Sequence, residues 1–340
     1  MLTCAFQTVV LSCVALFVGT VYPVRADEQP ADSVEMLAHA RKLEHLGAAS
    51  TAPFLLQAEI KAAFDKKEIP GSYKLFWWSP NRWQESMVLG DFRRMRDGVT
   101  GGYWQLRSWD YQPPMIFDLE KLLDIRSLLE VRSGETFRKV RMRKIAEMSL
   151  PCVEIDYHSA IARELCFDAA TGLLVHAESP GTTRPSSERT VFDYSEAISI
   201  STNQFPSILR LHRGKDFSIE VSVGRLQLVS EIQPPPPMSG SEQFEFWRSC
   251  QDMTPAILET TVKPQFPDAL RRTHGQGTVL LYARIEADGT ISHIKTLQSA
   301  SPILERVARE AVEQWRYKPA SCQGTPVKVE TVIETQFSGE

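Results

Sequence analysis

Hydrophobic and polar residues alternate along much of the chain between residues 54 and 229, a spacing typical of strands that bury one face. The clearest case is residues 54–63, where every second residue from Phe54 onward is apolar and the residues between them are mostly polar. Pro70-Gly71 is predicted to be the first hairpin turn, and further short strands follow at similar spacing. Helical spacing occurs at residues 32–46 and 119–131. Many antiparallel strands with a few helices predict a curved sheet or half-barrel.

The last part of the chain has a different pattern. The predicted elements are strands at 278–286 and 291–297, a helix from Pro302 to Trp315, and a strand at 327–337. Asp288-Gly289 is a hairpin turn signal between the first two strands. Ser301 is suited to cap the helix, with Pro302 at its first position. This order predicts a small ββαβ module, so the fold class of the whole chain is α+β.

Four consecutive prolines at 234–237, followed by Ser239-Gly240-Ser241, break the strand pattern and favour an extended spacer. We take this segment as the main domain boundary. The expected organisation is a signal peptide at 1–26, a helical lead at 27–50, an antiparallel β domain at 51–232, a proline-rich linker at 233–255 and a C-terminal domain at 256–340.

The N-terminus predicts export. No charged residue occurs before Arg25, and residues 9–18 are strongly apolar. Val24-Arg25-Ala26 offers small or tolerated residues for signal peptidase, so we expect cleavage after Ala26 and a periplasmic protein. The uncharged stretch is also long enough to span a bilayer, so an uncleaved inner-membrane anchor is the alternative.

Cleavage after Ala26 would leave four cysteines, and an even number in an exported chain suggests disulfides with three possible connectivities. Cys152 and Cys166 flank a predicted hairpin, so we expect the pairs Cys152–Cys166 and Cys250–Cys322. Four reduced, buried thiols are the alternative. A metal site is disfavoured because no Cys-x-x-Cys spacing occurs.

Composition and motifs exclude several function classes. A net charge of -4 and a pI near 6.0 argue against nucleic acid as the main partner. The sequence contains no nucleophile elbow, Walker loop, His-Glu-x-x-His or dinucleotide fingerprint. We therefore expect a non-enzymatic protein with no catalytic residue, no cofactor and no metal.

The landmarks of the C-terminal segment resemble the C-terminal domain of TonB. They are Pro264-Gln265-Phe266-Pro267-Asp268-Ala269-Leu270, Gly275-Gln276-Gly277-Thr278-Val279, Asp288-Gly289, Trp315-Arg316-Tyr317-Lys318-Pro319-Ala320 and Gly324-Thr325-Pro326-Val327. The family has Tyr where this chain has Phe266. The resemblance implies a periplasmic module that binds a short N-terminal segment of outer-membrane receptors by adding it to its sheet as a strand.

Family comparison implies that the last strand is the docking edge. The implied partner-binding residues are Val329, Thr331, Ile333, Thr335 and Phe337, with Pro264, Gln265, Phe266 and Pro267 close by. An open strand edge offers unpaired backbone groups to an extended peptide, which agrees with that use. The alternative is that the strand is a covered edge and that Phe266 is a core residue. Trp315 lies on the apolar helix face and is expected in the core.

The preceding domain resembles, less specifically, periplasmic carriers of the LolA/LppX type, a half-barrel with helices in its mouth. The resemblance rests on the hairpin layout and on Cys166-Phe167-Asp168-Ala169-Ala170-Thr171-Gly172-Leu173-Leu174. Five of the seven tryptophans fall between Trp77 and Trp109, which makes an apolar cavity for a lipid or acyl chain one interpretation. An ordinary aromatic core is the other.

Two functions stay open at this point. The first is a TonB-family protein that binds outer-membrane TonB-dependent receptors in energy-coupled transport. The second is a soluble periplasmic lipid or lipoprotein carrier, or adaptor, that uses the TonB-like module for docking. TonB itself works through an inner-membrane helix and a long proline-rich spacer, whereas the spacer here is a single short proline run.

Overall fold

The computed structural model describes residues 31–43, 46, 52–131, 134–157, 160–179, 189–201, 203–229, 244–248, 250, 253–265 and 277–337. The expected signal peptide and the proline run lie outside these residues, as do Phe266 and Pro267. None of the helices in the described ranges combines the length and the hydropathy needed to cross a membrane.

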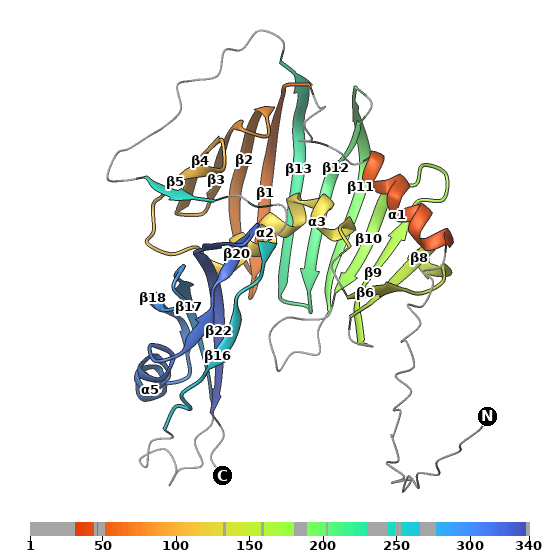
Figure 1. The fold of residues 1–340 in the computed structure, drawn as a ribbon. Helices are drawn as coiled ribbons and strands as arrows, with labels where there is room; N and C mark the ends of the chain where they lie inside the picture. Colours follow the sequence, from red (N-terminus) through yellow and green to blue (C-terminus); the bar gives the residue numbers. More distant parts are fainter. Residues whose placement is uncertain are drawn as a thin grey trace, which may run out of the picture.

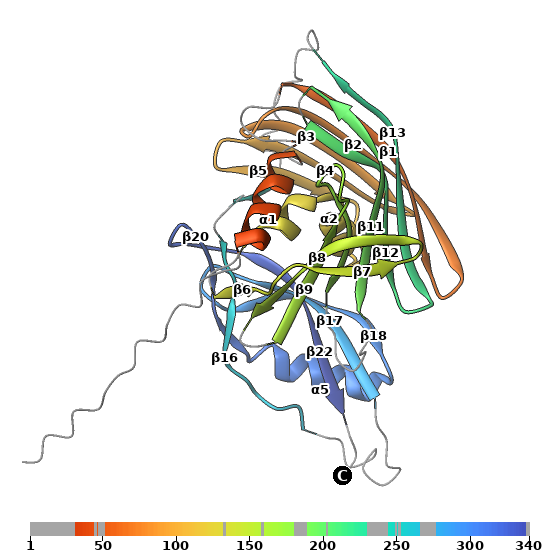
Figure 2. The same cartoon turned by 90° about the vertical axis from the view of Figure 1, so that its right-hand side faces the viewer.

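Most of the described chain forms one sheet of fourteen antiparallel strands, coloured from orange to green in Figure 1 apart from the cyan edge strand β14. In order across the sheet they are β14 (Glu245–Trp247), β5 (Gly102–Arg107), β4 (Phe92–Val99), β3 (Arg82–Leu89), β2 (Lys67–Ser79), β1 (Phe54–Phe64), β13 (Phe217–Leu228), β12 (Asn203–Arg213), β11 (Thr190–Ile200), β10 (Leu174–Ser179), β9 (Ala160–Phe167), β8 (Met148–Tyr157) and β6 (Glu135–Phe137), with β7 (Arg141–Ile145) also paired to β8. The sheet curves strongly in Figure 2. The predicted antiparallel, curved sheet is therefore present.

Strand β1 shows how an alternating sequence forms a strand with one buried face. Phe54, Leu56 and Ile60 point into the core and are at most 2% exposed, whereas Glu59 and Lys61 between them are exposed. Side chains of a strand alternate between its two faces, so an alternating sequence buries one face only. This confirms the first predicted strand.

The first hairpin turn lies elsewhere than predicted. Asp65 and Lys66 form it, with φ values of 47° and 63°, the left-handed conformation that two-residue hairpin loops require. Strands β1 and β2 pair continuously across Pro70 and Gly71, so the turn predicted there is wrong. Gly71 instead allows close packing, because a Cβ atom at this residue would lie 2.4 Å from the carbonyl oxygen of Val88.

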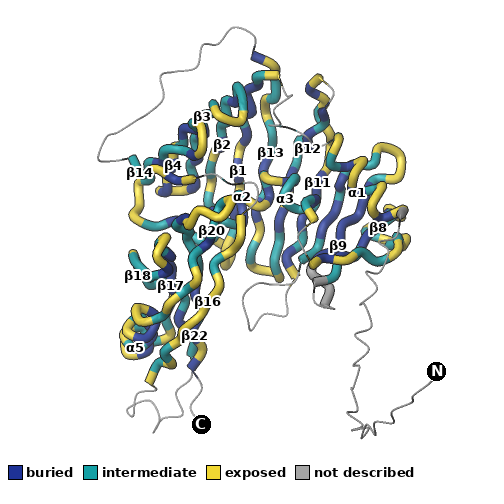
Figure 3. The backbone as a smooth tube through the Cα atoms, viewed as in Figure 1, coloured by how far each residue is buried: buried dark blue, intermediate teal, exposed yellow. Residues whose placement is uncertain are grey.

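Three helices fill the concave side of the sheet: α1 (Ala31–Leu43), α2 (Pro114–Leu123) and α3 (Ile125–Leu129). Figure 2 shows α1 and α2 within the curve, and Figure 3 shows the buried positions, in dark blue, concentrated on the large sheet and its helices. Proline at the first position of α2 suits a helix start, and Asp124 then caps α3 by accepting from the backbone N–H of Ser127 at 3.3 Å. The helix residues buried against the sheet include Leu37, Ala40, Ile116, Leu119, Leu122, Ile125 and Leu129.

The C-terminal module is a separate three-stranded sheet. Its strands run in the order β18 (Ile291–Ser299), β17 (Gly277–Ile285) and β22 (Val329–Phe337), and α5 (Pro302–Val312) packs on it. Ser301 caps α5 by accepting from the N–H of Leu304 at 3.2 Å, as predicted. Gly289 has a φ of 82° in the predicted turn, where the side chain of Asp288 accepts from the Thr290 N–H at 2.9 Å. The strand–strand–helix–strand order matches the prediction.

Short strands link the two sheets. They are β16 (Ile257–Thr260) paired with β19 (Arg316–Lys318), and β15 (Met253–Thr254) paired with β20 (Ala320–Cys322), which also pairs with β21 (Thr325–Val327). Strand β14 follows the proline-rich segment in sequence, yet it pairs with β5 at the edge of the large sheet. A few residues later, Cys250 is disulfide-bonded to Cys322 of β20. Residues 244–254 thus attach to both modules, and we call them the connecting segment.

Candidate partner-binding site

Strand β22 lies at an edge of the C-terminal sheet. It pairs with β17 along its whole length, from Val329 opposite Ile285 to Phe337 opposite Gly277. Strand β17 pairs with β18 on its other side, so among the described strands β22 has a neighbour on one side only. An edge strand presents a row of backbone N–H and C=O groups with which an extended peptide can pair.

The side chains predicted to bind the partner point mostly into the module's own core. Val329, Thr331, Ile333, Thr335 and Phe337 occupy alternate positions and therefore share one face of β22. Ile333 and Phe337 belong to the core beneath α5, and Thr335 is buried with its hydroxyl lacking a partner among the described residues. A peptide at this strand would therefore meet the backbone edge more than these side chains, whose role in binding stays a prediction.

Two residues of the predicted Pro-Gln-Phe-Pro motif, Pro264 and Gln265, lie within the described part of the chain. Pro264 is half-buried and Gln265 is exposed, and both follow β16. Just before them, the carbonyl oxygen of Val262 accepts a hydrogen bond of 2.9 Å from the indole N–H of Trp315. Trp315 also packs against the core under α5, as expected. The motif is thus held next to the helix end of the module.

The opposite face of β17 and β22 contacts the N-terminal module. Glu330 of β22 forms an ion pair with Arg107 of β5, and both side chains are only 7% exposed. The hydroxyl of Tyr282 donates to the same carboxylate. The ring of Tyr282 lies 5.9 Å from that of Tyr111, in the segment between β5 and α2. One buried polar contact therefore joins the docking strand to the large sheet.

The electrostatics of this contact favour a neutral Tyr282 and a charged Arg107. Burial raises the pKa of Tyr282 above its ordinary value, and the nearby charge of Glu330 raises it further. Burial alone would lower the pKa of Arg107, but the Glu330 carboxylate outweighs it and raises the pKa. Glu330 thus accepts from the Arg107 guanidinium and from the Tyr282 hydroxyl together.

A second contact comes from the connecting segment. Glu245 of β14 accepts from the two terminal guanidinium nitrogens of Arg284, Nη1 and Nη2, at 2.8 and 3.0 Å, and forms an ion pair with Lys328. The ring of Trp247 lies 5.2 Å from the Arg284 guanidinium carbon and 4.6 Å from the Lys328 ammonium nitrogen. Burial alone would raise the pKa of Glu245, but the bond to Lys328 and the charge of Arg284 hold it below its ordinary value.

Sequence reasoning missed these contacts between the modules. Arg107 and Glu330 are 223 residues apart, and no local pattern relates them. Arg284 and Lys328 fall at the outward-facing positions of alternating stretches, where charged residues are ordinary, so their charges gave no signal of the contact.

A separate cleft of about 480 Å³ opens between α2, α3 and the sheet. Its lining, drawn from residues 73–127, is Tyr73, Glu85, Met87, Arg96, Phe117, Glu120, Lys121, Leu123, Asp124 and Ser127. The lining contains no tryptophan, so the aromatic cavity suggested by the sequence does not coincide with this cleft. The aromatic residues instead pair with one another elsewhere, as Phe54 does with Trp77 at 5.6 Å and Phe76 with Trp78 at 5.5 Å.

A buried ionic network closes the floor of this cleft. The fully buried guanidinium of Arg94 donates to Glu85 at 2.7 Å and to Glu120 of α2 at 2.6 Å. Arg96 donates to the same oxygen of Glu120 at 2.6 Å. Burial alone would raise the pKa of Glu120, but Arg96 and Arg94 outweigh it and hold the pKa below its ordinary value. The network thus ties α2 to strands β3 and β4.

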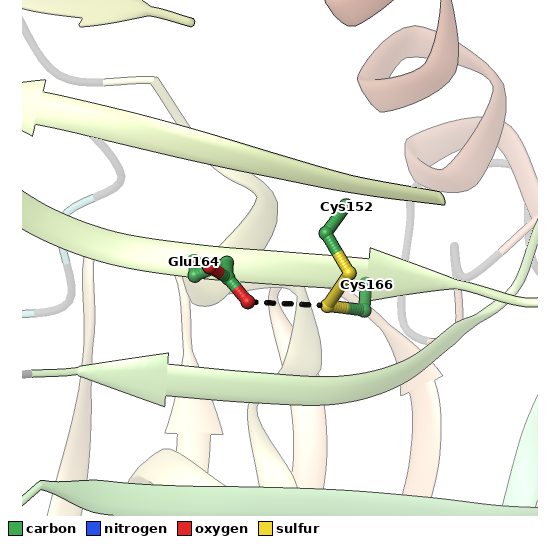
Figure 4. A group of neighbouring side chains, drawn as sticks. All are labelled: Cys152, Glu164 and Cys166. Atoms are coloured by element: carbon green, nitrogen blue, oxygen red, sulfur yellow. Dashed lines mark hydrogen bonds between the residues drawn. A yellow bond between two sulfur atoms is a disulfide. The ribbon is translucent and has the colours of Figure 1, made fainter. Parts of the chain in front are cut away.

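Both expected disulfides are present. Cys152 of β8 and Cys166 of β9 lie directly opposite one another, and Cys250 is joined to Cys322. Figure 4 shows the carboxylate of Glu164 beside Cys166, with an oxygen 3.5 Å from the sulfur. These three side chains are close enough to hold a metal ion, but a disulfide does not offer the thiolates that zinc binds. The cluster is therefore a cross-strand disulfide with a neighbouring carboxylate.

Comparisons with known proteins separate the two parts of the chain. Residues 262–338 match the family described as Gram-negative bacterial TonB protein C-terminal. Protein TonB of Vibrio cholerae is 30% identical over 87 residues, which cover 25% of this chain and 36% of that protein, so the match spans about a third of this relative's length.

Two solved structures are also similar to parts of the chain. The TonB C-terminal domain of Pseudomonas aeruginosa is 25% identical, with a TM-score of 0.23, and the match covers 26% of this chain and 89% of that one. A putative outer membrane lipoprotein-sorting protein domain from Vibrio parahaemolyticus is 8% identical, with a TM-score of 0.39, over 59% of this chain and 93% of that one. The last quarter of the chain, residues 262–338, is thus similar to the C-terminal domain of TonB proteins, both by the family match and by the curated relative.

Proposed function

We propose that this chain is a periplasmic, non-enzymatic TonB-family protein that binds N-terminal segments of outer-membrane receptors by strand addition in energy-coupled transport. The observation that carries the proposal is the position of β22 at the edge of the sheet in a domain of this family. Strand addition needs an accessible row of backbone groups, and β22 is a nine-residue edge strand that can supply one.

Two neighbouring proline substitutions test the docking edge. The N–H and C=O of one strand residue point to the same side, and the side alternates from residue to residue. Of Glu334 and Thr335, one therefore directs its N–H toward β17 and the other toward the open edge. Proline removes the N–H, so the edge-facing substitution should weaken binding by about tenfold or more, while the β17-facing one should mainly lower stability.

The measurement is the affinity for synthetic peptides that carry N-terminal segments of the outer-membrane receptors encoded in the same genome, by fluorescence anisotropy. Glu334→Ala and Thr335→Ala are the matched controls, because they keep the N–H and should bind like the unaltered protein. A folded, edge-facing proline variant that binds as tightly as its alanine counterpart would contradict strand addition at β22.

We propose lipid carriage as a second candidate function, supported by the cleft under α2 and α3. Its volume falls within the range of small-ligand sites, and Met87, Phe117 and Leu123 give it apolar surface beside the charged floor. We expect protein purified from the periplasm to carry a lipid or acyl chain detectable by native mass spectrometry. A ligand-free mass, unchanged after incubation with phospholipid vesicles, would count against this candidate.

A further inference from the structure

The two ends of the docking strand have different surroundings. In Figures 1 and 2, β22 starts beside the N-terminal module and runs away from it toward the C-terminus. Glu330, near the start, is 7% exposed because Arg107 and Tyr282 enclose its carboxylate. Gln336, near the end, is exposed. This face of the strand is thus enclosed at Glu330 and exposed at Gln336, with Val332 and Glu334 half-buried between them.

The cover at the start of β22 is built from two parts of the N-terminal side. Arg107 and Tyr111 come from β5 and the segment that follows it, and they lie against Glu330 and Tyr282. The connecting segment adds Glu245 and Trp247, which hold Lys328 immediately before the strand. Because β14 is paired with β5, both parts belong to one sheet edge.

A peptide that adds to β22 would meet this cover. The new strand would lie about 4.8 Å from β22, and every second side chain would point to the face where Arg107 packs. Over the second half of β22 that face carries Val332, Glu334 and Gln336, and the ionic contacts described above are all with residues before them. A peptide can therefore pair there without displacing the Arg107 side chain.

We propose that the N-terminal module shields the first part of the docking strand, Val329–Thr331, through the Arg107–Glu330 contact. The full chain then offers a receptor segment only the second half of β22, and opening the contact lengthens the available edge. This inference rests on the proposed docking function of β22. It makes Arg107 a residue that controls how much of a peptide is bound, although it does not line the edge itself.

A charge swap tests the shield. Arg107→Glu places two carboxylates against each other and should open the contact, whereas Arg107→Glu combined with Glu330→Arg should close it again. We expect faster hydrogen exchange at the amides of residues 329–331 in the single variant, and roughly tenfold tighter binding of the receptor peptides, since more strand pairs become available. The double variant should restore both values.

The control is Asp110→Lys, which reverses a more exposed contact between the modules, the 2.6 Å pair of Asp110 with Lys295. It should change the exchange of residues 329–331 and the peptide affinity by less than about twofold, because exposed ion pairs contribute little. Unchanged exchange in folded Arg107→Glu protein would overturn the shield. Faster exchange with unchanged peptide affinity would overturn its control of binding. If neither protein bound any peptide, the docking function would fail, and the exchange rates alone would decide whether Arg107 covers the strand.

Discussion

Replacing Arg94 with leucine should lower the free energy of unfolding of the N-terminal module by about 3–5 kcal/mol. The Arg94 side chain is fully buried, and it is the cation that Glu85 and Glu120 face across the floor of the cleft. Without it, the buried side chain of Glu85 loses its guanidinium partner in a site from which water is largely excluded. Urea unfolding followed by circular dichroism measures the loss.

Two further measurements distinguish the loss of the Arg94 ion pairs from a general loss of stability. Arg306→Ala removes the ion pair with Glu310, whose side chains are 64% and 57% exposed, and should lower the free energy of unfolding by less than about 0.5 kcal/mol.

The dependence of stability on acid pH should also change in the Arg94→Leu variant. Because Glu120 has a lowered pKa in the folded protein, its contribution is present at neutral pH and is lost as the pH falls through that pKa. This acid-induced loss should be smaller in Arg94→Leu protein, and an unchanged acid profile would contradict the assigned pairing.

Removing the disulfide between Cys250 and Cys322 by a double serine substitution should lower the stability of the C-terminal module by about 4 kcal/mol. The bond joins residues 72 positions apart, so its loss gives the unfolded chain much conformational freedom. Scanning calorimetry of the oxidised protein would resolve the effect on each module.

The second disulfide provides the matched comparison. Cys152 and Cys166 are separated by 14 positions, so their double serine variant should lose about 3 kcal/mol, in the transition of the N-terminal module. The ordering of the two losses, and their assignment to different modules, are the informative results. Equal losses in one shared transition would show that the two modules unfold as a single unit.

The turns show which structural features a local sequence signal can predict and which it cannot. Asp288-Gly289 was found because glycine marks a left-handed residue, and the structure places it at φ 82°. The turn at Asp65 and Lys66 was missed because neither residue is a glycine, although both adopt positive φ. Pro70, by contrast, lies inside a strand. The hairpin geometry was set by pairing along the whole length of β1 and β2 rather than by a glycine in the loop.

The candidate site likewise has one feature that could be predicted from the sequence and others that could not. The edge strand could be predicted because alternation in residues 327–337 and the family resemblance both concern a short stretch of chain. The cover over its first residues could not, because it depends on a hydrogen bond between positions 223 residues apart. The pairing of the connecting segment with the large sheet could not be predicted either, because strand β14 is only three residues long and its partner, β5, lies far earlier in the chain.

Strand β14 determines how a mechanical load would travel between the modules. Tension on β22 reaches the large sheet by two routes: directly through the Arg107–Glu330 contact, and through the Cys250–Cys322 bond and the connecting segment to three residues paired with β5. So short a pairing should separate before either sheet does. Once β14 and the side-chain contacts have separated, only the covalent chain joins the modules, and the distance between them would grow in one step.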